Sequence, residues 1–243
     1  MIYQKEEKIS FYDLDANGNT KLTALLKYIN EAAFYNAEDL GIGIEKTLEI
    51  DLAFIISRVG VRIFKVPELN EKVVVRTWPK EITRSSFKRN GDIRNEDGSK
   101  LLEWESLWVL IDINERKIKR PSAFPIEIPR YGKMDVEVEA NKIVMPEVKE
   151  ESAFYKHNVQ FSELDINLHM NNAIYGDLIA NVLALFSSPN INAWKEVQFN
   201  YVHEAKLGNE VLVNSYESNG CLYITGSFKE KTIFTAAINY HKE

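Results

Sequence analysis

The feature that most constrains the fold of this chain is a short stretch that occurs twice. Residues 161–172 read FSELDINLHMNN and residues 11–20 read FYDLDANGNT, so the two share Phe, an acidic residue, Leu, Asp and Asn at corresponding positions. Each stretch leads into apolar residues at helical spacing, and a second match, residues 67–75 with residues 205–213, follows each helix. Self-similarity of this kind predicts two copies of one structural plan.

The two copies differ in their ionisable residues. Asn19 of the first copy stands where the second copy has His169, and Val66 stands where the second copy has Glu204. A duplicated domain that keeps ionisable groups at corresponding positions in only one half is expected to have one active site. We therefore predict that this site lies in the second half.

The second polar stretch combines three chemically different side chains. Asp165, Asn167 and His169 stand at alternate positions, so in an extended segment their side chains leave the backbone on one face. Asn171 or Asn172 is a good N-cap for the helix that follows. The backbone amides at the start of that helix and the positive end of its dipole would favour a developing negative charge.

Each half is expected to contain one helix followed by long strands. The first helix is predicted over residues 20–40, capped by Thr20 and ended by Gly41, and the second begins at Ala173 and runs to Phe186. The predicted strands are residues 5–15, 54–64, 72–78, 85–94 and 100–111 in the first half, and a strand from Phe154 followed by 194–201, 210–216, 222–228 and 232–240 in the second. Because strands do not alternate with helices, a doubly wound parallel sheet is excluded, and the predicted fold class is α+β with an antiparallel sheet wrapped around each helix.

The length of 243 residues allows two small domains that each bury a usable core. We predict an N-terminal domain over residues 1–120, a proline-marked linker over residues 121–150 and a C-terminal domain over residues 151–243. Residues 41–51 have no counterpart in the second half and are a candidate insertion or lid.

The candidate site residues suit acid–base chemistry. A carboxylate beside an imidazole gives a proton acceptor that works near neutral pH, so Glu204 and His169 would activate water. Asp165 would orient His169 or the water, and Asn167 would donate its amide hydrogens to an oxyanion. Taken singly, His169 could be a capping residue and Glu204 a surface acid. Their joint absence from the first half favours an active site.

Other kinds of site fit the sequence less well. Ser162 and Cys221 have no base at a supportive spacing, so direct attack by water is preferred over a covalent nucleophile. A metal site formed by Asp165, His169 and Glu204 agrees with the ligand types, but no His-Glu-x-x-His motif is present. Neither a metal nor another cofactor is expected.

Charge and composition limit the partners. The net charge of −6 argues against nucleic acid, and no apolar run of about 18 residues suggests a membrane span, so a cytoplasmic protein is expected. A single cysteine excludes an internal disulfide framework. Two basic runs stand out against this background, and they contain Arg84, Lys88, Arg89, Arg94, Arg116, Lys117, Lys119 and Arg120. They are either solvated charged faces or a landing surface for an acidic partner.

Taken together, these motifs resemble the acyl-acyl-carrier-protein thioesterases of plants and bacteria. The resemblance rests on the runs DINLHMNN at residues 165–172, YVHE at residues 201–204 and RTWP at residues 76–79, and it covers nearly the whole chain. It implies two hotdog folds in tandem, each a long helix wrapped by an antiparallel sheet. Plant members carry a cysteine after the acid that Glu204 matches, and the Ala205 found here agrees with direct attack by water.

The resemblance also implies a function and a division of labour. The active site would lie in the second hotdog, with Asp165, Asn167, His169 and Glu204 as its polar members, and the acyl chain would lie largely in the first. The expected reaction is hydrolysis of the thioester between a fatty acyl chain and acyl carrier protein. Because that carrier is acidic, the docking surface would contain Arg84, Lys88, Arg89, Arg116, Lys117, Lys119 and Arg120.

Two alternatives are kept. An acyl-CoA thioesterase would have the same fold and a small soluble substrate. A non-catalytic acyl-binding or acyl-sensing hotdog protein belongs to another class, and the asymmetry between the two halves argues against it. The preferred chain length depends on a tunnel between residues 22–40 and the sheet, and formation of a homodimer is left open.

Overall fold

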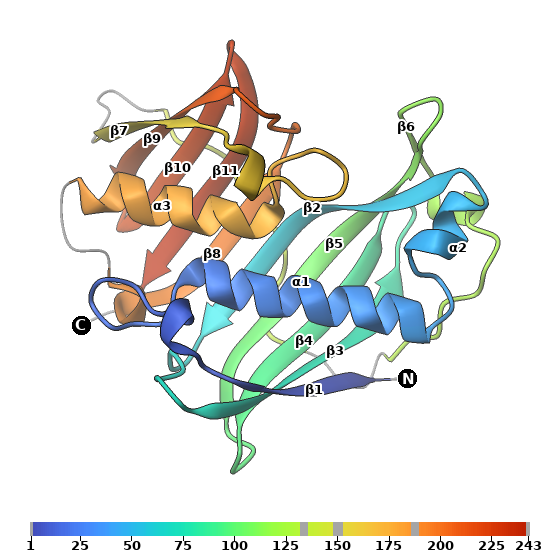
Figure 1. Ribbon diagram of the computed structural model, residues 1–243, viewed down its shortest axis with the longest axis horizontal. Coiled ribbons are helices and arrows are strands. Elements are labelled where there is room, and N and C mark those ends of the chain that lie inside the picture. The colour runs from blue at the N-terminus through green and yellow to red at the C-terminus, as the bar shows by residue number, and fades with distance from the viewer. Residues whose placement is uncertain (1, 132–135, 148–152, 186–189, 242–243) are drawn as a thin grey trace. The chain divides into compact units, whose positions relative to one another are not determined.

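The computed structural model describes residues 2–131, 136–147, 153–185 and 190–241, and the chain divides into two compact units (Figure 1). The first unit comprises Met1–Lys8, Tyr28–Phe64 and Glu71–Asn141, and the second comprises Ile9–Lys27, Lys65–Asn70 and Lys142–Glu243.

The helices are α1 (Leu22–Asp39), α2 (Ile44–Leu48) and α3 (Tyr175–Ala184). The strands of the first unit are β1 (Tyr3–Lys8), β2 (Leu52–Ile63), β3 (Lys72–Ile82), β4 (Phe87–Asn95), β5 (Lys100–Asp112) and β6 (Lys117–Lys119). Those of the second unit are β7 (Ala153–Asn158), β8 (Trp194–Tyr201), β9 (Glu210–Ser218), β10 (Cys221–Phe228) and β11 (Lys231–Tyr240). Short 3₁₀ helices occupy Phe11–Asp13, Pro121–Ala123, Phe161–Glu163, Asn172–Ile174 and Ile191–Ala193.

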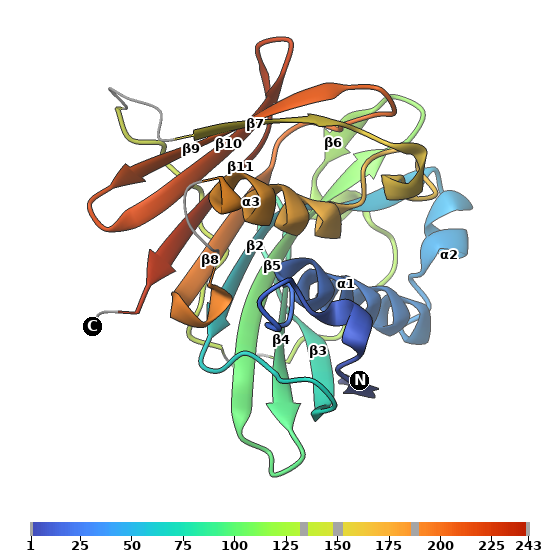
Figure 2. The same cartoon turned by 60° about the vertical axis from the view of Figure 1, so that its left-hand side comes forward.

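The strands of the two units follow the same order. In the first unit the strand order is β1-β3-β4-β5-β2, with β6 beside β5, and in the second it is β7-β9-β10-β11-β8. Every pair in these orders is antiparallel. A helix crosses one face of each sheet, α1 in the first unit and α3 in the second (Figures 1 and 2). The predicted duplication and the tandem hotdog fold are therefore confirmed.

Local sequence signals set the ends of several elements. Gly41 follows α1 with a φ of 69°, a left-handed conformation that glycine adopts without steric cost. Asn219 and Gly220, both at positive φ, make the tight turn between β9 and β10. Two predictions near α1 were wrong. The first strand ends at Lys8, and Thr20 is no cap, because its hydroxyl donates a hydrogen bond to the carbonyl of Pro67 at 2.6 Å.

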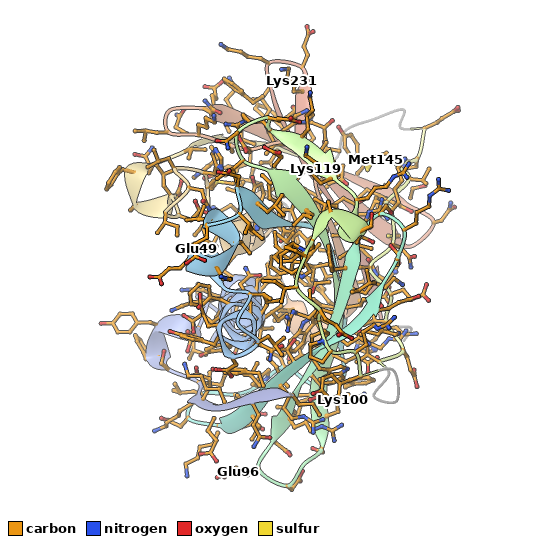
Figure 3. The ribbon with its side chains drawn as sticks, turned by 90° about the vertical axis from the view of Figure 1, so that its right-hand side faces the viewer. Glu49, Glu96, Lys100, Lys119, Met145 and Lys231 are labelled. Carbon is orange, nitrogen blue, oxygen red and sulfur yellow. The ribbon has the colours of Figure 1, made fainter. Side chains whose placement is uncertain are left out.

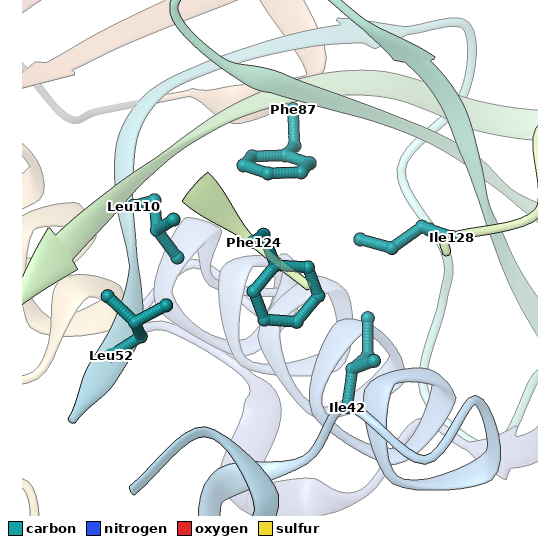
Figure 4. Packing of buried hydrophobic residues seen from close by; sticks show 6 residues of the cluster. All are labelled: Ile42, Leu52, Phe87, Leu110, Phe124 and Ile128. Carbon is teal, nitrogen blue, oxygen red and sulfur yellow. The ribbon is translucent and has the colours of Figure 1, made fainter. Parts of the chain in front are cut away.

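The core of the first unit closes around the end of α1. One cluster consists of buried side chains from the connection between α1 and α2, three strands and the segment after β6, namely Ile42, Leu52, Phe87, Leu110, Phe124 and Ile128 (Figure 4). The candidate lid at residues 41–51 forms α2 and packs through Ile42 and Ile50 into this cluster. The predicted helix residue Phe186 lies outside the described residues.

The linker also packs on the first unit. The backbone amides of Glu137 and Ala140 donate to the buried carboxylates of Glu103 and Glu105 at 3.0 and 3.2 Å. Lys100, labelled in Figure 3, donates to the other oxygen of Glu103 at 2.5 Å. Since these carboxylates sit on β5, they fasten the described part of the linker to the sheet.

Among the helices that the structure describes, none combines the length and apolar character that a membrane crossing requires.

Candidate active site

The polar stretch of the second unit is held by one carboxylate. Oδ1 of Asp165 accepts hydrogen bonds from the backbone amides of Asn167 at 2.8 Å and His169 at 3.3 Å, while the Asp165 amide donates to the His169 carbonyl at 2.8 Å. Oδ2 lies 3.5 Å from Nδ2 of Asn167. Asp165 therefore closes a tight loop around itself, in the way that Asp side chains stabilise turns.

This loop is not the extended segment assumed from the alternation of residues. It begins with the 3₁₀ helix Phe161–Glu163 and turns back at Leu168, whose φ is 62°. An extended segment would have left the backbone amides of Asn167 and His169 without the carboxylate acceptor that Asp165 supplies. The turn brings the side chains of Asp165 and Asn167 into contact, whereas His169 meets Asp165 through its backbone amide.

His169 and Glu204 meet as an acid–base pair. Nε2 of His169 lies 3.0 Å from Oε2 of Glu204, and their side chains are 22% and 36% exposed. Backbone contacts align the two segments, since Met170 donates to the carbonyl of Ala205 at 2.8 Å and His169 bridges to Lys206. The pair is thus reachable by solvent and substrate while its partners are positioned by the backbone.

Lys206 is a member of the site that the sequence did not indicate. Its Nζ lies 3.7 Å from Oε2 of Glu204, and its side chain is 54% exposed. Because both side chains are partly exposed, the ion pair contributes little to stability. The ion pair depends on the bridge between two segments far apart in sequence, so no local signal could have identified it.

The backbone amides at the start of the helix after the loop were expected to bind an oxyanion. This expectation was wrong for the amides of Ala173 and Ile174. Asn171 is the N-cap, as predicted, and its Oδ1 accepts from the amide of Ala173 at 2.9 Å. The amide of Ile174 donates to the carbonyl of Asn171 at 3.0 Å. Because the cap already satisfies both amides, Asn167 is the candidate that keeps an exposed donor on this loop.

The base of the loop is tied to β7. Oε2 of Glu163 lies 2.8 Å from Nε2 of His157 and accepts the amide of Gln160 at 2.8 Å, while the Glu163 carbonyl accepts the amide of Asn171 at 2.9 Å. Both side chains of the His157–Glu163 pair are mostly buried. Glu163 therefore connects the loop to β7 through His157 and to the segment before α3 through Asn171.

Two tyrosines form an apolar wall behind the loop. Tyr175 at the start of α3 and Tyr201 at the end of β8 contact each other edge to face with ring centroids 5.4 Å apart. Burial raises the pKa of both phenols well above the ordinary value, and the charge of Asp165 contributes to the shift of Tyr175. Both phenols therefore stay protonated at neutral pH, and the hydroxyl of Tyr201 donates a hydrogen bond to the carbonyl of Asn172 at 3.3 Å.

Exposed apolar side chains flank the polar groups along the chain. Ile166 and Leu168 are 78% and 67% exposed, and Val202 and Leu207, on either side of Glu204, are also exposed. Apolar surface beside a small number of polar groups is typical of a site for an organic ligand. Within the described segments, no group of three His, Cys, Asp or Glu side chains is placed to hold a metal ion.

The predicted docking residues include a buried one, two that are held in ion pairs, and four that are exposed. Arg89 is buried beneath α1 and cannot contact a partner, so its prediction was wrong. Lys88 pairs with the buried Glu105 at 3.5 Å, and Lys119, labelled in Figure 3, pairs with Asp112 at 3.2 Å. The exposed members are Arg84, Arg116, Lys117 and Arg120, and Lys117 lies 3.8 Å from Glu115.

Models of two known protein domains match most of this chain. The model described as the acyl-ACP thioesterase N-terminal domain matches residues 1–123, and that of the acyl-ACP thioesterase C-terminal domain matches residues 146–242. A dodecanoyl-[acyl-carrier-protein] hydrolase of Cinnamomum camphora is 24% identical over 208 residues, which are 80% of this chain and 54% of that protein. The chain spans about half the length of the curated relatives it matches.

Solved structures have the same fold over the whole chain. An acyl-ACP thioesterase from Bacteroides thetaiotaomicron superposes with a TM-score of 0.85 at 22% identity, covering 99% of this chain and 98% of that one. A 12:0-ACP thioesterase from Umbellularia californica gives a TM-score of 0.82 at 16% identity, covering 100% and 98%. At these identities the likeness is one of fold.

Proposed function

Because the chain belongs to the acyl-ACP thioesterase family, we propose that it hydrolyses fatty acyl thioesters of acyl carrier protein to free fatty acid and carrier protein. The observation that carries this proposal is the contact between His169 and Glu204 at 3.0 Å beside the Asp165 turn. It provides a proton acceptor next to an amide donor, which suits attack on a carbonyl.

In the proposed reaction, water is the nucleophile. Glu204 and His169 together take a proton from water as its oxygen bonds to the thioester carbon. The carbonyl oxygen becomes an oxyanion, and then the carbon–sulfur bond breaks as the carbonyl re-forms. The proton held by the pair goes to the departing sulfur, which leaves as a thiol, so the pair returns to its starting state.

The polar neighbours have separate proposed roles. Asn167 would donate to the oxyanion through Nδ2, whose 3.5 Å contact with Asp165 is long enough to be exchanged for a better acceptor. Asp165 would hold the backbone of the loop. Cys221 is buried and its thiol pKa is raised by burial, which supports a reaction without a cysteine nucleophile.

The direct test is a substrate panel. We expect release of free fatty acid from acyl-carrier-protein thioesters of several chain lengths, with a higher kcat/KM than for the matching acyl-CoA thioesters. A preference for acyl-CoA would support the first alternative. Binding of acyl groups without turnover would support a non-catalytic acyl-binding protein.

The carrier protein is the proposed partner, and Arg84, Arg116, Lys117 and Arg120 are the revised docking set. Replacing Arg84 and Arg120 by Glu should raise KM for a carrier-protein substrate, more strongly at low salt than at high salt, because exposed charges are screened. Lys229→Glu combined with Lys231→Glu, at two exposed positions of the second unit, changes the net charge equally and is the matched control (Lys231 is labelled in Figure 3). An equal effect of both replacements would show that net charge, and not this surface, matters.

A further inference from the structure

A polar cluster is buried in the first unit, between α1 and its sheet. Arg89 of β4 is 9% exposed, and its Nη1 donates to Oδ1 of Asn36 on α1 at 2.5 Å. The same nitrogen lies 3.5 Å from Oγ1 of Thr77 on β3. Asn36 and Thr77 are themselves fully buried. The guanidinium therefore points into the interior on the side that the helix covers.

Within the part of the chain that the structure describes, the charge of Arg89 has no buried counter-ion. Both acceptors are neutral, and among the described residues the structure places no carboxylate within ion-pair distance of the guanidinium. Burial lowers the pKa of Arg89 to about 10, so the group stays protonated at neutral pH. An arginine buried without a counter-ion is costly to keep in a folded protein, and groups of this kind concentrate at functional sites.

Trp104 of β5 supplies a second, independent donor to the same region. Gly91 pairs with Trp104 and Arg89 pairs with Ser106, so Trp104 and Arg89 are diagonal neighbours on one face of the sheet. Nε1–H of Trp104 is fully buried and has no acceptor among the described residues. Buried indole N–H groups normally have a partner.

The position of the indole is fixed by the glycine beneath it. A Cβ added to Gly91 would collide with Cζ2 and Cε2 of Trp104, so the ring rests directly on the Gly91 backbone. Its unpaired N–H is therefore held in place and not averaged over several rotamers. Donors outnumber acceptors here, because a guanidinium carries five N–H groups and the indole one, whereas Asn36 and Thr77 supply the acceptors seen for Arg89.

We propose that Arg89 and Trp104 bind an acceptor oxygen on the acyl group, so that the enzyme selects fatty acyl chains that carry a hydroxyl or oxo group. This inference rests on the proposed function. A plain hydrocarbon chain would leave the N–H of Trp104 without an acceptor and would add none for Arg89 beyond Asn36 and Thr77, whereas a hydroxyl or carbonyl oxygen accepts from either residue. Sites built to hydrogen-bond a substrate oxygen discriminate strongly against the analogue that lacks it.

The test compares acyl groups of equal length with and without oxygen. The wild-type protein is assayed with plain, hydroxy and oxo acyl-carrier-protein thioesters, with the oxygen at C3, mid-chain and the distal end. We expect kcat/KM to favour one oxygenated position by about tenfold or more, the size of one well-made hydrogen bond. Hydroxy and oxo substrates at that position separate the two sources of the acceptor.

Two variants remove the donors and one serves as a control. Trp104→Phe keeps the ring and deletes the N–H, and Arg89→Met removes the guanidinium. Trp108→Phe is the matched control, because Nε1 of Trp108 already donates to Oγ of Ser106 at 2.9 Å. Trp104→Phe and Arg89→Met should abolish most of the preference for oxygenated chains, while Trp108→Phe leaves it unchanged.

Two outcomes would overturn the inference. One is a wild-type protein without preference for any oxygenated chain, and the other is a loss of rate on all substrates in the same proportion, which would assign Arg89 and Trp104 to structure alone. Calorimetric binding of free hydroxy, oxo and plain fatty acids separates this result from a failure of the proposed function. Tighter binding of the oxygenated acid, lost in Trp104→Phe, would support the oxygen site even if no thioester is hydrolysed, and equal binding would contradict it.

Discussion

The two polar loops of the chain have nearly the same backbone and very different side chains. In both, one Asp carboxylate accepts two backbone amides, from Asn17 and Asn19 at 2.8 and 2.9 Å on Asp15, and from Asn167 and His169 at 2.8 and 3.3 Å on Asp165. In both, the Asp amide donates at 2.8 Å to the carbonyl four residues later. The shared Asp is therefore a structural residue of the turn in each copy.

What differs is the group that the turn presents. Oδ1 of Asn19 accepts from Nδ2 of Asn192 at 2.7 Å, so that position is used to hold structure. Val66, opposite Glu204 in the repeat, is 4% exposed. The same Asp-centred turn therefore occurs in both copies. Only the second copy presents His169 and Glu204, and these two side chains make it a candidate catalytic site. Four predictions test this distinction.

The largest effect is expected from the acid–base pair. His169→Ala and Glu204→Ala should each lower kcat on the order of 10²–10⁴-fold, as for loss of a general acid–base group. The corresponding changes Asn19→Ala and Val66→Ala should leave kcat near that of the wild type. Comparable losses in both sets, measured by release of free fatty acid, would remove the distinction between the loops.

The shared Asp should matter to stability in both copies and to rate in one. Asp15→Ala and Asp165→Ala each leave two backbone amides without their acceptor and should lower the free energy of unfolding by about 1–3 kcal/mol. Only Asp165→Ala should also lower kcat, because His169 is displaced. Chemical denaturation and steady-state assays on the same preparations measure both quantities. A stable Asp165→Ala protein with unchanged kcat would assign Asp165 no role.

The residue at the turn of each loop should give a smaller effect of opposite sign. Leu168 has a φ of 62° and Gly18 a φ of 81°. Leu168→Gly should raise the free energy of unfolding, and Gly18→Ala should lower it, each by about 1 kcal/mol, because a side chain is strained in the left-handed region. Thermal denaturation measures the pair. Destabilisation by Leu168→Gly would show that the exposed Leu side chain makes contacts that outweigh its strain.

The smallest effect is expected from Lys206. Its ion pair with Glu204 at 3.7 Å is exposed, so Lys206→Met should change the stability by about 0.2–1 kcal/mol and kcat/KM by only a few fold. The corresponding residue of the first copy is Glu68, and Glu68→Met is the control. A loss of kcat as large as that of Glu204→Ala would move Lys206 into the catalytic set.

Much of the architecture followed from local patterns. Long alternating or β-branched runs, and turn signals such as Asp97-Gly98 and Asn219-Gly220, predicted most of the strands to within a few residues, because periodicity and turn chemistry act over short distances. The first strand is the exception, since it ends at Lys8 and not at residue 15. The duplicated stretch predicted two copies of one plan, and the identical strand orders confirm it. His169 and Glu204 were found by comparing the copies, since a side chain retained in only one of them has no role in the shared frame.

The tertiary structure decided what depends on contacts distant in sequence. A basic run could not reveal that Arg89 points under α1 while Arg84 stays exposed, because the direction of each side chain depends on strand register and on the helix above. Alternation predicted an extended polar segment, but the hydrogen bonds to Asp165 favoured a turn. Sequence patterns were sufficient to predict the fold and its duplication, and they nominated Asp165, Asn167, His169 and Glu204 as candidate site residues without indicating Lys206. Only the tertiary structure determined their geometry, because Glu204 reaches His169 through a backbone bridge that joins segments far apart in the chain.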